Sequence, residues 1–463
     1  MINTMKRGAA AWAAGCALLA AGPGAAPAAA QADPAEPDHA HAAAAAARPA
    51  ILPLRERAAV IDAILEERLD TVMPQIMREE GVDLWLLMAR EYFEEPVVES
   101  MLDARSMAAR RRTILIFFDP GEGRPIERLT VSRYGLAGLF EPAWDPELEP
   151  DQWRAVADII EARDPDSIAI NTSALTAFGD GMTASQYHAL LTALPDAYHD
   201  RLISGERLAV RWLETRTPSE LALYPDIVRI AHSIMARAFS REVITPGVTT
   251  LEDVTWWYRD EVSRLGLNVW FNPSMGLQRE GVEGILRGDE VIRPGDLIWT
   301  DFGLSYLRLN TDTQQLGYIL RPGETEAPAG LAAGLAATNR VQDILTSHFQ
   351  VGRSGNEALA LTRAQAIEEG LSPSVYTHPI GAHGHGAGPA IGFWDNQGPT
   401  LRGAGPINAD TAWAIELTSF SAVPEWDGQI VDFRSEKNAI FDGETVRYID
   451  GRQTELILIP SDG

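Results

Sequence analysis

Two aspartates eleven residues apart carry the clearest chemical signal in this sequence. Asp301 and Asp312 lie in a mainly apolar stretch that starts at Leu297 and contains no proline. The run up to Asp301 predicts a buried strand, because β-branched and aromatic residues fit a pleated surface. If residues 306 and 307 form a tight turn, Asp301 lies directly opposite Asp312, with the Cβ atoms about 5 Å apart.

Two half-buried carboxylates at that separation repel each other unless they share a proton or a cation. The predicted hairpin therefore has the features of half of a metal site. A pair of exposed turn aspartates explains the same pattern equally well, and this stretch alone does not decide between the two interpretations.

The C-terminal half of the chain supplies more groups of the kind that bind metals. Residues 378–385 contain His378, His383 and His385. Glu416 ends an apolar strand-like run, and Glu436 lies in another strand-like segment near the end of the chain. Oxygen-rich sites with one imidazole suit paired Mn, Fe, Co or Zn ions, which carboxylates bridge. The four carboxylates together carry a charge that two divalent ions would balance.

The order and spacing of these aspartates, glutamates and histidine resemble those of the pita-bread metallopeptidases, the family of methionine aminopeptidase, aminopeptidase P and prolidase. The match covers roughly residues 217–460. Residues 51–215 resemble the N-terminal domain of the branch that contains aminopeptidase P, prolidase and creatinase. The resemblance implies two divalent metal ions, with Mn the first expectation and Zn, Co or Fe the alternatives, and a homodimer.

The same resemblance implies a role for each ligand. Asp301 would chelate one ion. Asp312 and Glu436 would bridge the two ions, and His378 and Glu416 would hold the second.

The choice of His378 over His385 as the ligand rests on spacing. In the family, a glycine follows the metal-binding histidine three residues on and a second histidine follows it seven residues on. His378 meets this pattern with Gly381 and His385, whereas the same places after His385 hold Gly388 and Gly392. His385 is then the imidazole that contacts the developing oxyanion or shuttles a proton.

The resemblance implies amide hydrolysis by a hydroxide that bridges the two ions, since bound metal lowers the pKa of water. The metals and His385 would stabilise the tetrahedral oxyanion, and Glu416 would pass a proton to the leaving nitrogen. Arg434 lies two residues before Glu436, as in the aminopeptidase P branch, and is expected to orient a bridging carboxylate through its planar guanidinium. A surface salt bridge is the alternative role for Arg434.

Two features bear on specificity. The aminopeptidase P branch carries a substrate-lining histidine upstream of the first aspartate, but here that place falls near Gly284, and no histidine lies between His232 and His348. The glycine- and proline-rich stretch 386–399 follows His385 and either walls a pocket for a proline ring or packs as a loop.

The candidate substrate-binding residues are the remaining histidine of the cluster and two aromatic residues of that stretch: His383, Phe393 and Trp394. The expected activity is that of a metal-dependent Xaa-Pro aminopeptidase or dipeptidase acting on small peptides. The alternatives are a lyase or hydrolase acting on a small non-peptide substrate, and a metal-binding, non-catalytic peptide-binding module. The second alternative is disfavoured because such modules typically lose ligands, whereas all five are present here.

The expected fold class is α+β, in two domains. Strand-like runs alternate with helical spacing over residues 51–215, which predicts an α/β domain with a central sheet. Thr217 and Glu220 form a capping box that predicts a helix start, so the catalytic domain is expected over residues 216–463. Helices followed by strands and glycine loops predict a curved antiparallel sheet that helices cover on one face.

The N-terminus predicts export. Residues 1–32 combine a positive start, a short apolar run and a small-residue site, the pattern of a secretory signal peptide with cleavage near Ala32. Lipidation at Cys16 is a weaker alternative, and the apolar run is too short to span a bilayer. Residues 33–50 predict a disordered leader. The protein is therefore expected to be secreted or periplasmic.

Charge and cysteine content exclude several classes. The formal net charge of −26 argues against nucleic acid or anionic membrane as a partner, because both select basic surfaces. Cys16 is the only cysteine, so the cleaved chain would have no disulfide, thiolate metal site or thiol nucleophile. Catalysis must then use oxygen and imidazole groups.

Overall fold

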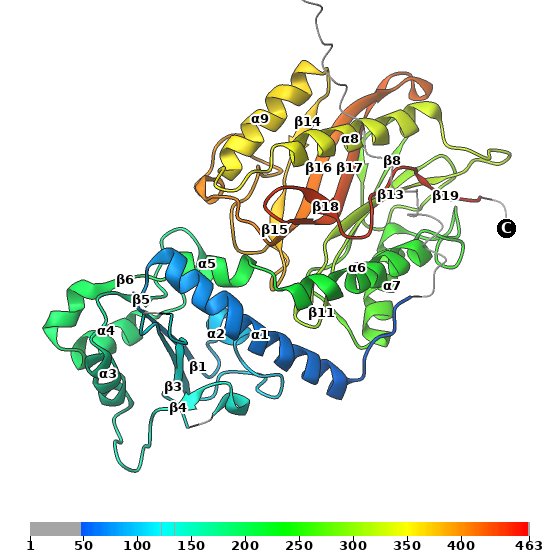
Figure 1. The fold of residues 1–463 in the computed structure, drawn as a ribbon. Coiled ribbons are helices and arrows are strands. Elements are labelled where there is room, and N and C mark those ends of the chain that lie inside the picture. Colours follow the sequence, from blue (N-terminus) through cyan, green and yellow to red (C-terminus); the bar gives the residue numbers. More distant parts are fainter. Residues whose placement is uncertain (1–47, 122, 134, 462–463) are drawn as a thin grey trace, which may run out of the picture. The chain divides into compact units, whose positions relative to one another are not determined.

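Two β-sheets, one in each half of the chain, organise the structure (Figure 1). The computed structural model describes residues 48–121, 123–133 and 135–461. The predicted signal peptide, its cleavage site near Ala32, Cys16 and residues 33–47 of the predicted leader lie outside the described residues. Within the described ranges, every helix is too short or too polar to serve as a membrane span.

The N-terminal half begins with a long helix. This helix, α1 (Leu54–Glu80), ends at Gly81, whose φ of 66° is the left-handed conformation that glycine adopts most easily. The other helices of this half are α2 (Pro96–Ser100), α3 (Gln152–Arg163), α4 (Ala184–Ala193) and α5 (Glu206–Glu214). Its strands are β1 (Leu84–Arg90), β2 (Arg112–Phe118), β3 (Glu127–Thr130), β4 (Glu141–Pro142), β5 (Ile168–Ile170) and β6 (Leu202–Ser204).

These strands form one sheet in the order β4-β3-β2-β1-β5-β6. Strand β1 is antiparallel to β2 and parallel to β5, and β5 is parallel to β6. The apolar residues of β1 alternate between two buried clusters, one on each face of the sheet. The predicted α/β arrangement with a central sheet is confirmed.

The C-terminal half opens with the predicted capping box. The Glu220 N–H donates to the Thr217 hydroxyl, and the Thr217 N–H donates to the Glu220 carboxylate at 2.8 Å. This pair starts α6 (Pro218–Ala238), as predicted. The later helices are α7 (Leu251–Arg264), α8 (Ala329–Ser347) and α9 (Gly355–Glu368).

The large sheet has the order β14-β16-β17-β13-β10-β8-β9, with β15 beside β16, β18 beside β17 and β19 beside β13. Its strands are β8 (Ser274–Arg279), β9 (Val282–Leu286), β10 (Leu297–Phe302), β13 (Thr313–Ile319), β14 (Pro373–Val375), β15 (His378–Ile380), β16 (Thr411–Val423), β17 (Gln429–Phe441), β18 (Val446–Tyr448) and β19 (Ile457–Ile459). A small sheet joins β7 (Asn268–Val269), β11 (Leu304–Tyr306) and β12 (Leu309–Asn310).

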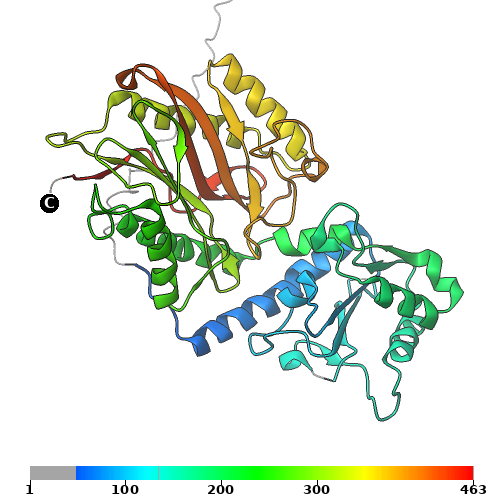
Figure 2. The ribbon, with the colours of Figure 1, turned by 180° about the vertical axis from the view of Figure 1, so that it is seen from behind.

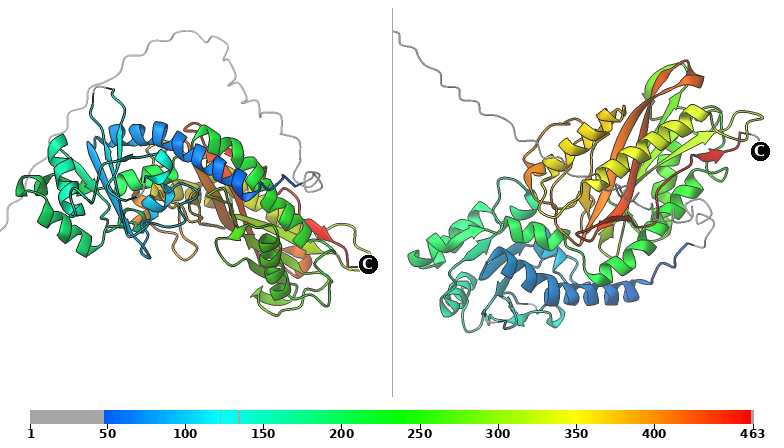
Figure 3. Two further views of the ribbon diagram at one scale, coloured as in Figure 1. Left: turned by 90° about the horizontal axis from the view of Figure 1, so that it is seen from below. Right: turned by 45° about the horizontal axis from the view of Figure 1, so that its top comes forward.

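Helices cover one face of the large sheet. Helices α6 and α7 pack on Ile298 and Phe302 of β10, and α8 and α9 pack on Trp413 and Ile415 of β16. Figure 3 (right) shows α8 lying across β16 and β17, and Figure 2 shows these long strands from behind. Residues between the packed ones project from the other face. The predicted α+β fold, with a curved antiparallel sheet covered by helices, is confirmed.

The boundary predicted between residues 215 and 216 separates the two sheets along the chain. All described residues fall in one compact unit, so the boundary itself stays a prediction.

Candidate metal centre

Five neighbouring strands of the large sheet carry one row of directly paired residues. In order from β8 to β16, the row is Ser274, Asp301, Gln314, Glu436 and Glu416. Directly paired residues of antiparallel strands project to the same face. Strand pairing alone therefore brings together three acids that lie far apart in the sequence, on the face opposite the covering helices.

The hairpin that carries the two aspartates differs from its predicted register. Its turn is formed by Leu307 and Arg308, whose φ values of 53° and 63° are both left-handed, as in the hairpin turns that match strand twist. Asp301 therefore pairs with Gln314, and the predicted direct pairing with Asp312 is wrong. Because the turn lies one residue later than predicted, the residue opposite Asp301 moves by two positions, from Asp312 to Gln314. A shift of two keeps the same face of the strand, so Asp312 still lies on the face of Asp301, diagonal to it.

His378 of β15 lies next to this row of acids. It pairs with Ala414 of β16, two residues before Glu416, and its side chain is fully buried. The His378 Nε2 atom lies 3.6 Å from an oxygen of Asp312, 3.7 Å from Glu436 and 3.9 Å from Glu416. The five candidate ligands are therefore brought together.

The tautomer of His378 follows from its other nitrogen. Nδ1 lies 3.0 Å from the carbonyl oxygen of Pro379, which can only accept a hydrogen bond. Nδ1 therefore carries the proton, and the lone pair of Nε2 points at the carboxylates.

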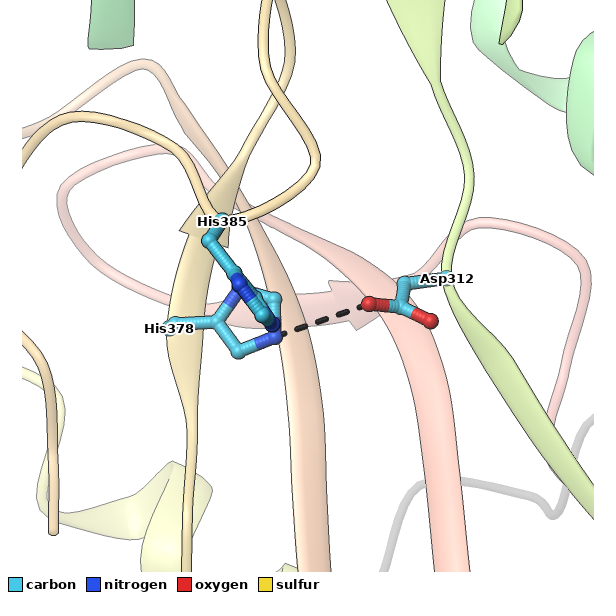
Figure 4. A group of neighbouring side chains, drawn as sticks. All are labelled: Asp312, His378 and His385. Atoms are coloured by element: carbon cyan, nitrogen blue, oxygen red, sulfur yellow. Dashed lines mark ion pairs between the residues drawn. The ribbon is translucent and has the colours of Figure 1, made fainter. Parts of the chain in front are cut away.

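His385 lies at the edge of the same cluster. Its ring centroid is 4.8 Å from that of His378, and the two rings are nearly perpendicular. Asp312, His378 and His385 each offer a ligand atom within 4.8 Å of the other two (Figure 4). His385 is exposed, whereas His378 is buried, so the two imidazoles meet the cluster from different environments. The predicted division between a metal ligand, His378, and a group that contacts substrate, His385, stays a prediction.

Burial sets the protonation of the cluster. Loss of solvent raises the pKa of Asp301 to about 7, and the pKa values of Asp312, Glu416 and Glu436 lie well above the ordinary range because of burial and mutual repulsion. Burial also lowers the pKa of His378 to about 3. In the absence of a cation the group would therefore hold protons on its carboxyls and keep its imidazole neutral.

Several ligand atoms of the cluster are buried and have no hydrogen-bond partner. They are Asp301 Oδ1, Asp312 Oδ1, His378 Nε2 and both carboxylate oxygens of Glu436. Buried polar atoms without partners are rare, because each loses its hydration without replacement. Converging oxygen atoms and one unprotonated nitrogen are the donor set of a divalent cation site, so the residues present fit metal ions.

Arg434 lies beside the cluster. Its Nη2 atom is 3.5 Å from Asp432, and its guanidinium lies 5.1 Å from the centre of the Trp299 ring. Its charge lowers the pKa of Asp301 and of Glu416 against the larger effect of burial. Arg434 thus acts on the carboxylates through its charge, while its hydrogen bond goes to Asp432.

The three candidate substrate-binding residues fall in different surroundings. The His383 ring packs on Phe178 at 4.6 Å, and burial lowers the pKa of His383 to about 4. The Phe393 ring stacks on Tyr376, which in turn lies 5.3 Å from the ring of His378. Trp394 is 76% exposed. Of the three, Phe393 has the most direct link to the cluster.

Sequence reasoning missed residues that support the site. Gln314 donates to Glu416 at 2.7 Å, and Trp270 packs edge-on against the ring of His385 at 5.1 Å. Gln314 follows Asp312 by two residues, and Tyr376 precedes His378 by two, so strand alternation was a usable signal for both. Trp270 offered no such signal, because its contact depends on how β7 and the loop after β15 meet.

A small cavity lies between α7 and the start of β8. It has a volume of about 160 Å³, and its wall includes Thr255, Asn272, Ser274 and Arg287. Ser274 pairs directly with Asp301. Burial lowers the pKa of Arg287, and the negative charge of Asp301 partly offsets that effect. Two residues of its wall, Ser274 and Arg287, are therefore linked to Asp301, the first by strand pairing and the second by charge.

Gly384 lies between His383 and His385, and the ring of Trp270 packs directly against it. A Cβ atom at this position would lie 2.3 to 2.4 Å from atoms of the Trp270 ring, whose Nε1 donates to the carbonyl of Thr311, next to Asp312. We expect Gly384→Ala to displace Trp270 and with it His385, and to lower kcat/KM by about tenfold or more. Gly405→Ala is the matched control, since its Cβ would meet only Pro389 at 3.7 Å. Equal activity of both variants in a peptide hydrolysis assay would contradict the expectation.

Comparison with known proteins places this site in a family. Residues 226–448 match the model of metallopeptidase family M24. The sequence matches none of the curated proteins compared with it.

Solved structures share the fold of this chain. An X-Pro aminopeptidase from Thermotoga maritima superposes with a TM-score of 0.58 at 14% identity, over 83% of this chain and 99% of that one. An Xaa-Pro dipeptidase from Bacillus anthracis has a TM-score of 0.55 at 19% identity, over 88% and 100% of the two chains. Aminopeptidase P from E. coli has a TM-score of 0.56 at 12% identity, over 84% and 96%.

The matched residues 226–448 belong to metallopeptidase family M24. The predicted resemblance to the aminopeptidase P, prolidase and creatinase branch of the pita-bread metallopeptidases is confirmed. The family match covers residues 226–448, and the fold is shared along nearly the whole length of these structures.

Proposed function

We propose that the protein hydrolyses the bond between a residue and a following proline in small peptides, with two divalent metal ions, most readily Mn, in the row of acids. The observation that carries this proposal is the convergence of unpaired buried donor atoms from the five candidate ligands. The fold shared with Xaa-Pro aminopeptidases and dipeptidases supports the choice of substrate. The four carboxylates and two divalent ions balance in charge.

The ligand roles follow the predicted scheme. Asp301 would hold one ion, Asp312 and Glu436 would lie between the two, and His378 and Glu416 would hold the other. When bound, two such ions supply a Lewis acid for the carbonyl group and lower the pKa of a water molecule so that it is nucleophilic at neutral pH.

The side chains of the protein would then handle orientation and protons. His385, exposed beside His378, would donate a hydrogen bond to the oxygen on which negative charge develops. Glu416 would take a proton of the attacking water and deliver it to the leaving nitrogen. Phe393 and Tyr376, stacked at 5.6 Å, would supply an apolar wall for the proline ring.

The cavity lined by Ser274 and Arg287 would receive the part of the substrate that carries a free carboxylate. Arg287 forms part of its wall and, among the described residues, has no carboxylate within salt-bridge distance. We expect Arg287→Met to raise KM for Ala-Pro about tenfold and to leave KM for the C-terminal amide of Ala-Pro within about twofold. The control Arg293→Met removes a nearby exposed arginine. An equal change for both substrates would argue against this role for Arg287.

The direct test of function is a screen of short peptides with metal-stripped protein reloaded with Mn, Co, Zn or Fe. Peptides with proline in the second position should be cleaved after the first residue, and matched peptides with alanine in that position should not. Product analysis separates hydrolysis from elimination. Lack of turnover with every metal would refute the proposal.

Export and dimer formation complete the proposal. The signal-peptide pattern supports secretion or a periplasmic location, and N-terminal sequencing of exported protein should find a start near Asp33. A start at Met1 would refute export. The family resemblance supports a homodimer, and light scattering should give twice the mass of the mature chain rather than the mass of one.

A further inference from the structure

Gln314 is the uncharged member in the middle of the row of acids. It pairs directly with Asp301 on one side and with Glu436 on the other, and it is 2% exposed. Its Nε2 atom donates to Glu416 Oε1 at 2.7 Å and lies 3.5 Å from Asp301 Oδ2. One amide group therefore contacts two candidate ligands that sit on different strands.

Trp299 fixes which way this amide points. Its indole Nε1 lies 2.9 Å from Gln314 Oε1. An indole N–H can only donate, so the amide oxygen must face Trp299 and the NH₂ group must face the acids. The indole is itself held in place, because the guanidinium groups of Arg287 and Arg434 lie 5.2 and 5.1 Å from its ring centre.

The hydrogen bond from Gln314 gives the two oxygens of Glu416 different partners. An amide N–H can only donate, so Oε1 of Glu416 is engaged as an acceptor. The other oxygen, Oε2, is the one that lies 3.9 Å from His378 Nε2, on the side of the cluster. A second acid in place of Gln314 would add a further negative charge, and therefore repulsion, to the row.

We propose that Gln314 is a positioning residue of the metal centre: its amide, oriented by Trp299, holds Glu416 Oε1 so that Oε2 alone is offered to the ligand side, and it steadies Asp301 at the same time. The inference rests on the proposed function insofar as it takes the cluster to bind divalent ions. Groups that orient metal ligands in this way affect metal affinity or activity by about 10- to 100-fold when removed.

The variant that tests the contact is Gln314→Met, which keeps the length of the side chain and removes its donor and acceptor. We expect it to weaken manganese binding by metal-stripped protein about 10- to 100-fold in calorimetry. We also expect kcat to fall by a similar factor of about 10 to 100, with KM within about threefold of wild type, because the substrate-facing groups remain. Gln453→Met is the matched control, since Gln453 is a buried glutamine whose three hydrogen bonds all go to backbone groups.

Trp299→Phe provides a second test that does not alter Gln314. It keeps an aromatic ring between the two arginines and removes only the orienting N–H. We expect a loss of manganese affinity of about three- to tenfold. In the double variant the loss should equal that of Gln314→Met alone, because the indole then has no amide to orient.

Three outcomes would overturn the proposal. They are a manganese affinity of Gln314→Met within about threefold of wild type, an equal loss in Gln453→Met, and additive losses in the double variant. Calorimetry needs no turnover, so the result stands apart from the peptide screen. Failure of wild type to cleave any peptide would refute the proposed function, whereas unchanged manganese affinity would refute the role of Gln314.

Discussion

Replacing His378 by alanine is expected to weaken manganese binding by at least about 100-fold and to lower kcat/KM by at least about 10³-fold. The reason is the buried Nε2 lone pair, which lies within 3.9 Å of oxygens of three acids and has no hydrogen-bond partner. Its removal takes the single buried imidazole from the cluster. Metal content after reconstitution and kinetics on Ala-Pro peptides measure the two effects.

His385→Ala is the matched comparison for His378→Ala. The two ring centroids lie 4.8 Å apart, and each substitution removes one imidazole. We expect it to keep manganese affinity within about threefold of wild type and to lower kcat by about 10² to 10³. The reverse pattern, with metal lost in His385→Ala and retained in His378→Ala, would show that the histidine assignment is wrong.

Removing metal should reverse the pH dependence of stability. Burial raises the pKa of Asp301 to about 7, and the pKa values of the other three acids lie well above the ordinary range. A carboxyl whose pKa is raised by folding stabilises the folded state below its unfolded pKa of about 4, and this contribution is lost as the pH rises through the folded pKa. Metal-stripped protein should therefore be less stable at pH 8 than at pH 5, by about 3 kcal/mol or more, or about 6 to 12 °C in Tm.

Manganese-loaded protein should show the opposite trend, because metal competes with protons for the same oxygens and binds better as the pH rises. Glu95 and Glu214, whose pKa values burial also raises to about 7, act in both forms, so the relevant quantity is the difference between the two pH profiles. Thermal unfolding with and without manganese between pH 5 and 8 measures it. Parallel profiles would mean that the acids do not share a cation.

Local signals were sufficient to predict most of the elements. The Thr217 and Glu220 capping box marks the start of α6, and Gly81 marks the end of α1. Such signals depend on neighbouring residues, which is why they can be found without tertiary information. The hairpin register could not be found this way, because its turn uses Leu307 and Arg308 in left-handed conformations that neither residue type favours.

In the candidate site, too, some residues could be found from the sequence and others only from the fold. Asp301, Asp312, His378, Glu416 and Glu436 were all singled out from the sequence, and the sheet brings them together. The supporting groups Gln314, Trp299 and Arg287 were missed because their roles depend on which strands are neighbours. Alternation along β13 places Gln314 on the same face as Asp312, but the acids that it contacts follow only from the order of the strands.

The most direct test of the central claim is anomalous diffraction from crystals of the metal-stripped protein soaked in manganese. The account predicts two manganese peaks about 3.5 to 4 Å apart, among the side chains of Asp301, Asp312, His378, Glu416 and Glu436. A single peak elsewhere, or no peak at these five residues at saturating manganese, would contradict it.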